Sequence, residues 1–470
     1  MQSVRKFIIA AISVCLLVVG IVTVVKSTDR EGQQKFNTAR QKQSAPNVLS
    51  VDSIEKTDRL INRLNKRNSV GVIEHSTRTK SHYVDNEVTV KFKVHPNQEQ
   101  LAEIERSIDG RLVKNLKTVC IFSSKSRSVS DLVDYFNDDT NVIYVEPNYI
   151  YVPNNHRTLQ GRDTTFRKPN DILYPDYQWN LPMIGTEIGW EITRGSEEVT
   201  IAVIDTGVDL HHPDLAGRLV EGRNILAEND NADDDNGHGT HVAGIIASQT
   251  NNREGIAGMT WFNKIMPIKV MNAEGSGTSF DVANGIMWAT NHGAEVINLS
   301  LGNYQPAEVI EEAIQHAFDN NVILVAATGN DSTDQPGYPA AYPQVISVAA
   351  VDRDGEWAEF SNFGNYVDVT APGVAIASTY PGNAYAELSG TSMAAPHVTA
   401  LAALIRSSYP ELSNTRVKQI INQTTTDLGQ PGYDDYYGNG LINIAEALQA
   451  AHKNQYPLGR LSEWWEQIIS

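Results

Sequence analysis

Cysteine is almost absent from this sequence, which has two in 470 residues, Cys15 and Cys120. Cys15 lies in an apolar run at the start of the chain, so we expect no stable disulfide between the two. The long region after Cys120 must therefore fold without disulfide bonds. That region can hold neither a catalytic thiol nor a zinc site built on cysteine.

Positive charge is also scarce. The chain carries 38 Lys and Arg against 56 Asp and Glu, which gives a net charge of −18. Proteins that bind nucleic acids need a basic face, so no nucleic-acid partner is expected. An acidic surface instead suits a soluble exported protein whose carboxylates hold cations.

A long uncharged run is present at the N-terminus. The 19 residues from Phe7 to Val25 carry no charge and follow Arg5 and Lys6. This length suits either a cleaved secretory signal peptide or an uncleaved membrane anchor, and no small-x-small cleavage motif decides between them. We expect residues 1–26 to direct export, so that the protein is secreted or is held at a membrane by this segment.

The sequence from residue 27 to residue 170 divides into three parts. Residues 27–85 are polar and weakly periodic, as expected of a linker. Residues 86–152 predict a small α+β domain in which strand and amphipathic helix patterns alternate, and residues 141–152 predict a closing pair of strands. Residues 153–170 are a polar joint without a clear pattern.

Residues 171–452 are expected to form the main domain. Five apolar runs rich in branched residues predict strands buried on both faces, at 199–205, 265–271, 294–302, 321–330 and 345–352. Helical patterns occur at 238–250, 281–292, 306–320, 393–408 and 414–425. This alternation predicts an α/β fold, with a mainly parallel, doubly wound sheet and helices on both faces. Residues 453–470 form a C-terminal tail with no assignable role.

Three polar residues lie where the ligand site of such a sheet is expected, at the ends of strands or the start of a helix. Asp205 follows TIAVI, Asn330 ends VILVAATGN, and His238 begins a helix in NGHGTHVAG. Taken singly, Asp and Asn are ordinary turn residues, and the DDD run before His238 also fits a metal loop. The zinc spacing His-Glu-x-x-His is absent, so a neutral imidazole acting as general base is the better interpretation.

Ser392 in GTSMAAPHV likewise allows either a structural or a catalytic role. Serine is a common helix N-cap, so a structural role is favoured when the residue is considered alone. Pro396 predicts that the helix begins almost at Ser392, because proline is tolerated in the first helical turn. The hydroxyl would then lie at the positive end of a helix, beside a backbone N–H that can bind an oxyanion. With Asp205, His238 and Asn330, it completes a set suited to nucleophilic catalysis.

The motifs VIDTGVD, NGHGTHVAG, ATGN and GTSMAAPHV resemble the signatures of the subtilisin-like serine proteases, in particular their thermitase-type branch. The resemblance covers about residues 171–452 and preserves the family's Asp, His, Ser order. It implies that Ser392 attacks the scissile carbonyl, while His238 moves the proton to the leaving amine. It further implies that Asp205 orients the imidazole and that Asn330 and the Ser392 N–H hold the oxyanion.

The resemblance also implies where a substrate binds. An extended peptide would pair with two segments of the enzyme, as an added strand does. The first segment contains Gly275, Ser276 and Gly277, and the second contains Ser300, Leu301 and Gly302. The walls of the first specificity pocket would be Ala327, Thr328 and Gly329, with Gly337 at its base. None of these residues is charged, so we expect broad specificity with a preference for large apolar side chains before the scissile bond.

A structural Ca²⁺ site is the third implication of the resemblance. Its side-chain ligands would be Asp171, Asp214 and Asn252. Its backbone ligands would be the carbonyls of Gln249, Glu254 and Ile256. Oxygen ligands from loops suit calcium, and a solvated polar loop is the alternative interpretation.

Residues 86–152 resemble the family's propeptide, which inhibits the enzyme by placing its carboxyl end in the active site. The joint at 153–170 would then contain the self-cleavage site. The expected protein is a monomeric, calcium-stabilised serine endopeptidase, made as a zymogen and acting on proteins and peptides. The alternatives are a catalytically silent binding module, which would usually lack part of the catalytic set, and a peptide ligase or cyclase, which would need a device that excludes water.

Overall fold

The computed structural model describes residues 48–50, 60–61, 63–67, 69–75, 80–153 and 169–455. These residues belong to one compact unit that begins at Asn47. The expected export segment at 1–26, most of the joint at 153–170 and most of the tail lie outside the described residues.

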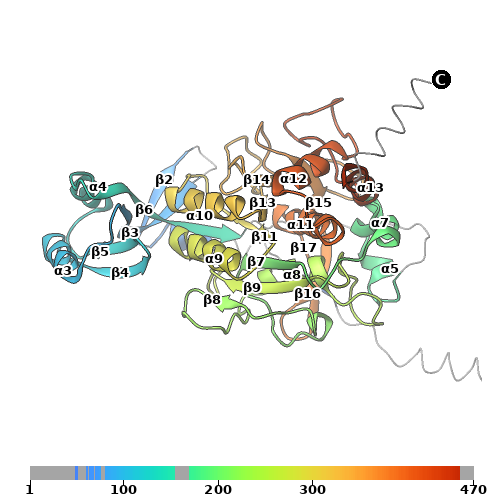
Figure 1. Cartoon of the computed structure of the whole chain (residues 1–470), viewed down its shortest axis with the longest axis horizontal. Coiled ribbons are helices and arrows are strands. Elements are labelled where there is room, and N and C mark those ends of the chain that lie inside the picture. The colour runs from blue at the N-terminus through green and yellow to red at the C-terminus, as the bar shows by residue number, and fades with distance from the viewer. Residues whose placement is uncertain are drawn as a thin grey trace, which may run out of the picture. The chain divides into compact units, whose positions relative to one another are not determined.

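A seven-stranded sheet forms the centre of the main domain (Figure 1). Its strands follow the order β15-β14-β13-β11-β7-β9-β8, and every neighbouring pair is parallel. In that order, the strands span Val369–Pro372, Val345–Val351, Ile323–Ala327, Val296–Leu299, Thr200–Asp205, Lys264–Lys269 and Arg223–Asn224. The predicted α/β class with a doubly wound, mainly parallel sheet is confirmed.

Helices cover both faces of this sheet because successive residues of each strand point to opposite sides. Ile201 and Val203 of β7 belong to one apolar core, and Ala202 and Ile204 belong to the other. The first core also contains residues of α8 (His238–Ala247), α11 (Thr391–Ser408), α12 (Asn414–Gln423) and α13 (Ile444–Gln455). The second contains residues of α9 (Ser279–Asn291) and α10 (Glu308–Asp319).

Smaller elements complete the main domain. The hairpin of β16 (Ile376–Tyr380) and β17 (Ala384–Leu388) forms a separate three-stranded sheet with β1 (Val48–Ser50), in the order β1-β17-β16. The remaining short helices are α5 (Tyr174–Tyr177), α6 (Asn180–Met183), α7 (Thr186–Ile192) and the 3-10 turn η1 (Pro213–Leu215). None of the described helices is both long and apolar enough to cross a membrane.

The N-terminal domain is an antiparallel sheet in the order β6-β3-β5-β4, with β2 paired to β3. Its strands are β2 (Val70–Glu74), β3 (Lys80–Phe92), β4 (Gly110–Leu116), β5 (Val119–Ser124) and β6 (Val142–Pro153). Two helices, α3 (Gln98–Ser107) and α4 (Val129–Asn137), contribute Ile104 and Phe136 to its core. The predicted small domain of sheet and helices is confirmed.

This domain differs from the sequence expectation at two points. Strand β2 and the first residues of β3 fall inside the range expected to be a linker, 27–85. The pair of strands expected at 141–152 is wrong, because these residues form the single strand β6. Pro147 does not end β6, since it pairs with Val88 beside a shift in register, where a strand tolerates proline.

Candidate active site

Asp205 and His238 meet at the edge where β7 ends and α8 begins. Asp205 is the last residue of β7, and His238 is the first residue of α8. His238 Nδ1 lies 2.7 Å from Asp205 Oδ1, and both side chains are buried. The backbone N–H of Thr206 donates to the same oxygen at 2.7 Å. An ionised carboxylate can only accept, so His238 Nδ1 is the donor and Nε2 of the neutral ring is an acceptor.

Asp234 is a buried residue that the sequence analysis did not identify. Its carboxylate accepts hydrogen bonds from the backbone N–H groups of Gly237 and Thr240 at 2.9 and 3.0 Å. It thereby caps α8, whose N-cap is a glycine without a capping side chain. It also accepts from Thr206 Oγ1 at 2.9 Å, so it ties the start of α8 to the end of β7. The DDD run concealed this role, because an acidic run before a histidine equally fits a metal loop.

Ser392 is the second residue of α11, and the helix start predicted from Pro396 is therefore confirmed. The predicted place of Pro396 in the first turn is wrong, because it is the sixth residue of the helix. Without an N–H, Pro396 leaves the Ser392 carbonyl without its helical partner. Ser300 Oγ donates to that carbonyl at 3.0 Å, and Ser392 Oγ donates to the carbonyl of Ser300 at 2.9 Å.

Asn330 is oriented by Thr391. Asn330 Oδ1 accepts from both the backbone N–H and the hydroxyl of Thr391, each at 2.9 Å. A backbone N–H can only donate, so the amide oxygen must face Thr391 and Nδ2 must face away from it. The N–H of Gly329 donates to Thr391 Oγ1 at 3.1 Å, which directs the hydroxyl proton toward Asn330. Thr391 is a positioning residue that sequence reasoning missed, although its place beside Ser392 was an available signal.

Two nitrogen atoms of this site are buried and have no hydrogen-bond partner within the described residues, His238 Nε2 and Asn330 Nδ2. Buried polar atoms in folded proteins normally have partners. One of the two can accept a proton, and the other can donate to an oxyanion. The site therefore offers a proton acceptor and an anion-stabilising donor from residues that are already held in place.

Strand β6 of the N-terminal domain pairs with both predicted substrate-binding segments. Gly277 of β10 (Gly277–Thr278) lies opposite Tyr151, in an antiparallel arrangement. Leu301 and Gly302, which form β12, lie opposite Pro153 and Val152, also antiparallel. The remaining members of the two segments adjoin these strands: Gly275 and Ser276 precede β10, and Ser300 precedes β12. The two segments thus hold an extended segment of the chain itself.

A cavity of about 180 Å³ adjoins this part of β6. The four predicted pocket residues, Ala327, Thr328, Gly329 and Gly337, all line it. A side chain at position 337 would place its Cβ 2.7 Å from the Thr328 carbonyl oxygen, so glycine keeps the cavity open. Asp331 also lines the cavity, and its carboxylate accepts from the Tyr304 hydroxyl. Sequence reasoning missed this carboxylate, which lies one residue beyond Asn330.

The predicted metal ligands gather around residues 249–256. Asp171 and Asp214 are both buried. Asp171 Oδ2 accepts from the N–H of Asn251 at 2.8 Å, and Asp214 accepts from Asn252 Nδ2 at 2.7 Å and from the N–H of Ile256 at 3.1 Å. The N–H of Gln249 donates to the Asp214 carbonyl, and that of Glu254 to Asn252 Oδ1. The structure therefore brings all six predicted residues together.

The electrostatics of this loop fit a cation. Burial raises the pKa of Asp171, and burial together with Asp171 raises the pKa of Asp214 to about 7. A bound cation would offset the cost of ionising both groups. No cluster of three or more His, Cys, Asp or Glu side chains placed to hold a metal occurs in the described part of the chain. A cation here would thus depend on amide and backbone oxygens as well as the two carboxylates.

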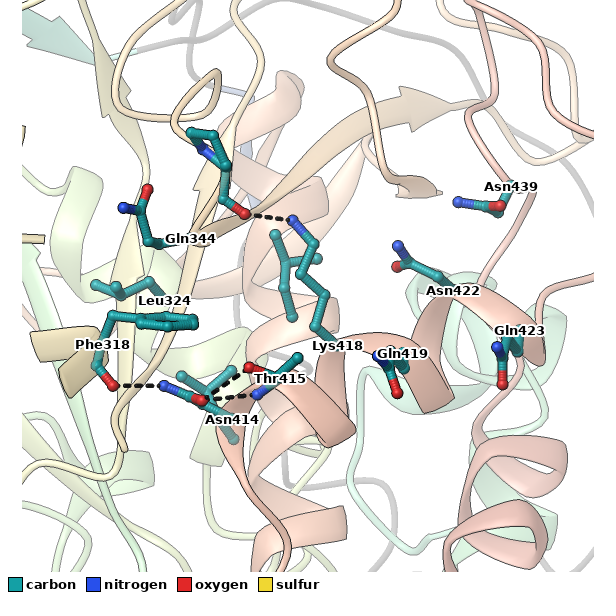
Figure 2. A pocket seen from close by; sticks show the side chains of 13 residues that line it. Phe318, Leu324, Gln344, Asn414, Thr415, Lys418, Gln419, Asn422, Gln423 and Asn439 are labelled. Carbon is teal, nitrogen blue, oxygen red and sulfur yellow. Dashed lines mark hydrogen bonds between the residues drawn. The ribbon is translucent and has the colours of Figure 1, made fainter. Parts of the chain in front are cut away.

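A larger cavity, of about 430 Å³, is lined by the side chains that Figure 2 shows. Its lining comes from the amino ends of β13 and β14 and from α12, whereas Asp205 ends β7 and Asn330 follows the carboxyl end of β13. Its one charged lining residue is Lys418, whose ammonium donates to the carbonyls of Pro343 and Val345 and pairs with Asp368 at 2.9 Å. Lys418 thus fastens α12 to the sheet, and no predicted site residue lines this cavity.

The parallel sheet, the Asp205–His238 pair at its edge and the serine at the start of α11 define a subtilisin-like serine protease. The chain belongs to the subtilase family, which it matches over residues 196–440. Residues 72–148 match the N-terminal prodomain of fervidolysin. The chain is thus a serine endopeptidase of the subtilase family with a prodomain before its catalytic domain.

Three relatives illustrate the likeness. The chain is 40% identical to a thermophilic serine proteinase of Bacillus sp. (strain AK1), across 78% of this chain and 88% of that protein. It is 41% identical to thermitase of Thermoactinomyces vulgaris, across 60% of this chain and 99% of that protein. The crystal structure of fervidolysin from Fervidobacterium pennivorans, a keratinolytic enzyme related to subtilisin, matches with a TM-score of 0.70 and 30% identity. That match covers 78% of this chain and 61% of fervidolysin.

Proposed function

We propose that this protein is an exported serine endopeptidase that is made as a self-processing zymogen and uses Asp205, His238 and Ser392 as its catalytic triad. The observation that carries this proposal is the buried 2.7 Å contact between Asp205 Oδ1 and His238 Nδ1. It leaves Nε2 of the same imidazole as an acceptor without a partner among the described residues. A general base of this kind is what a serine nucleophile requires.

In the proposed reaction, the Ser392 hydroxyl turns from the Ser300 carbonyl toward His238 Nε2, which takes its proton. Ser392 Oγ attacks the scissile carbonyl, and the imidazolium then protonates the leaving amine as the peptide bond breaks. The acyl-enzyme is hydrolysed by a water molecule that His238 deprotonates in the same way. Asp205 stabilises the imidazolium throughout and does not itself take up the proton.

The oxyanion of the tetrahedral intermediate is bound by Asn330 Nδ2 and by the backbone N–H of Ser392. The Asn330 amide is already turned for this task, because Thr391 holds its oxygen on the other side. Donors fixed before the reaction lower the barrier, since they need not reorganise as charge develops.

The N-terminal domain acts as an intramolecular inhibitor. An extended peptide substrate would add as a strand to the segments that contain β10 and β12. Residues 150–153 of β6 already pair with both of them, so the domain competes with substrate for the same backbone groups. Cleavage within the joint at 153–170 would leave the domain bound until it is released.

The substrates are proteins and peptides, with broad specificity and a preference for large apolar side chains before the scissile bond. The lining of Ala327, Thr328, Gly329 and Gly337 supports this preference. The Asp331 carboxylate, which accepts from the Tyr304 hydroxyl, lies at the same cavity. A specificity profile should therefore also include substrates with a basic side chain before the scissile bond.

Calcium is a structural cofactor of the proposed enzyme. Asp171, Asp214 and Asn252, with the carbonyls of Gln249, Glu254 and Ile256, would hold it. The ion would supply positive charge to two buried carboxylates and would cross-link the loop to the start of the catalytic domain. It would take no part in the reaction itself.

Processing of the full chain tests the proposed activity. We expect the wild-type protein to shorten by cleavage within 153–170 and then to hydrolyse casein, whereas Ser392→Ala should stay full length. A His238→Ala variant should behave like Ser392→Ala, and circular dichroism of both should match the wild type. Equal cleavage of the wild type and Ser392→Ala, or no casein hydrolysis after the prodomain is removed, would contradict the proposal.

A further inference from the structure

The short strand β1 lies before the prodomain in the sequence but pairs with the catalytic domain. It runs parallel to β17, with Val48 opposite Tyr385, residue 49 opposite Ala386 and residue 50 opposite Glu387. Strand β16 occupies the other edge of β17. Among the described strands, β1 is thus the one that covers the outer edge of this hairpin. A sheet edge without a partner exposes backbone groups that readily bind another extended segment.

Side-chain packing supports the same contact. Val48 is half-buried and packs into an apolar cluster formed by Leu173, Tyr177, Ile256 and Tyr385. All four of these residues belong to the catalytic domain. The first residue of β1 therefore has a specific apolar site in addition to the backbone pairing.

The hairpin that receives β1 is rigidly supported. His241 of α8 donates to carbonyls on both of its strands, with Nε2 at 2.9 Å from Ile376 O and 3.0 Å from Ala386 O. The Ser378 hydroxyl donates in return to the His241 carbonyl at 2.6 Å. A strand edge that is already held by hydrogen bonds loses little conformational entropy when another strand pairs with it.

We propose that residues 48–50 are a second anchor by which the pro-region stays attached to the catalytic domain after the chain is cut. This inference rests on the proposed role of the prodomain as an inhibitor. Cleavage within 153–170 would leave β1 and β6 on the same fragment, and β1 pairs with the hairpin while β6 pairs with the substrate-binding segments. Two linked contacts hold a partner far more strongly than either does alone, with a gain on the order of 100-fold or more where the linker permits both.

The contact itself can be tested in the uncut chain. In the full-length Ser392→Ala protein, a Leu49→Pro/Ser50→Pro double variant removes two adjacent N–H groups, one of which must face β17 because N–H directions alternate along a strand. We expect hydrogen exchange of amides within Ala384–Leu388 to become at least tenfold faster. The control Gln41→Pro/Lys42→Pro places the same change outside β1 and should leave exchange unaltered. Unchanged exchange in the β1 variant would overturn the proposal.

The anchoring role is tested in the chain that retains Ser392. Gel electrophoresis follows the cut, and hydrolysis of a chromogenic peptide follows the release of the inhibitor. We expect the Leu49→Pro/Ser50→Pro protein to be cut at the parental rate but to become active at least tenfold sooner after the cut than the parent or the control. An equal delay would show that β1 is no anchor. If no chain is cut, the protease proposal fails, and the exchange experiment alone then decides whether β1 occupies the hairpin.

Discussion

The Asn330 side chain depends on its neighbours for its orientation. Thr391 supplies two donors to Asn330 Oδ1, and its hydroxyl is itself fixed by the Gly329 N–H. Both Thr391 and Asn330 are buried, so water does not readily replace a lost bond. The proposed charge-stabilising role of Asn330 thus depends on Thr391, the residue that precedes the proposed nucleophile.

A Thr391→Val variant tests this dependence. Valine keeps the shape of threonine and the backbone N–H but removes the hydroxyl, so the Asn330 amide is held by one bond instead of two. We expect kcat to fall roughly tenfold with KM little changed, because the lost interaction acts on the transition state.

The comparison variant is Asn330→Ala, for which about a 100- to 1,000-fold loss of kcat is expected. In the Thr391→Val/Asn330→Ala double variant, the Thr391 change should add almost nothing to the loss of kcat, since the amide that Thr391 positions is gone. A full tenfold additional loss in the double variant would mean that Thr391 acts independently of Asn330.

Individual residues also mark the limit of what the sequence predicts. Asp205, His238, Asn330 and Ser392 stand out because motif and chain order identify them without a structure. Asp234 does not, because its role as the cap of α8 depends on where its carboxylate points. The contact between the Ser300 hydroxyl and the Ser392 carbonyl is likewise invisible, since 92 residues separate the two.

A buried carboxylate lies at the contact between strand β6 and helix α10. Helix α10 has no side-chain cap of its own. Glu146 of β6 supplies the cap by accepting from the N–H groups of Glu308 and Val309 at 2.8 and 3.1 Å. Burial raises the pKa of Glu146 to about 7, and the nearby Glu308 and Glu312 act in the same direction. Docking of the prodomain therefore involves a carboxyl group whose affinity for protons is increased.

This shift predicts how prodomain docking depends on pH. The pKa of a glutamate carboxyl is ordinarily 4.5, and burial raises that of docked Glu146 to about 7, so docking that buries this group would take up a proton between these values. Docking is then strongest below about pH 4.5 and weakens as the pH rises to about 7. We expect the cut prodomain to be released about tenfold or more faster at pH 7.5 than at pH 5, as measured by size-exclusion chromatography.

The matched variant for this experiment is Glu146→Gln, which stays neutral and keeps an oxygen that can accept from α10. It should release the prodomain with little dependence on pH over the same range. Release from the parent that does not change with pH, or that slows as the pH rises, would contradict this account.

Elements differ in how well local patterns predict them. Strands β7, β9, β11, β13 and β14 are apolar runs buried on both faces, and the sequence located each one. Strands β10 and β12 have two residues each and exist through pairing with β6, so no local pattern signals them. Strand β2 and the start of β3 lie in the range that the sequence indicated as a polar linker, and they are defined by pairing with each other.

Within the described residues no disulfide bond contributes to stability, since Cys120 is a free buried thiol. The loop at 249–256 joins Asp171, at the start of the catalytic domain, to Asp214. These two buried carboxylates repel each other when both are ionised, so a cation bound by the loop, as proposed, would add to its stability.

Removal of calcium should therefore destabilise the folded protein. We expect chelation to lower Tm by roughly 10 °C, because an ion that binds only the folded state stabilises it by mass action. Differential scanning calorimetry of full-length Ser392→Ala, with and without chelator, measures the effect without self-digestion.

Two variants make the calcium experiment specific. Asp214→Asn should have a lowered Tm that chelation no longer changes. Asp230→Asn alters another acidic loop, where Arg223 already pairs with the carboxylate, and should keep the full response to chelation. A Tm of the parent that chelator leaves unchanged would rule out the proposed ion.

The central claim is that Ser392 is a nucleophile activated by His238, and covalent labelling of the processed enzyme tests it most directly. A fluorophosphonate reagent should add one group per molecule, and peptide mapping by mass spectrometry should locate it on Ser392. Labelling needs the same general base as substrate hydrolysis. A His238→Ala enzyme whose prodomain has been removed in trans should therefore react with the reagent at least 100-fold more slowly. A label on another residue, or casein hydrolysis that persists after Ser392 is fully labelled, would contradict the account.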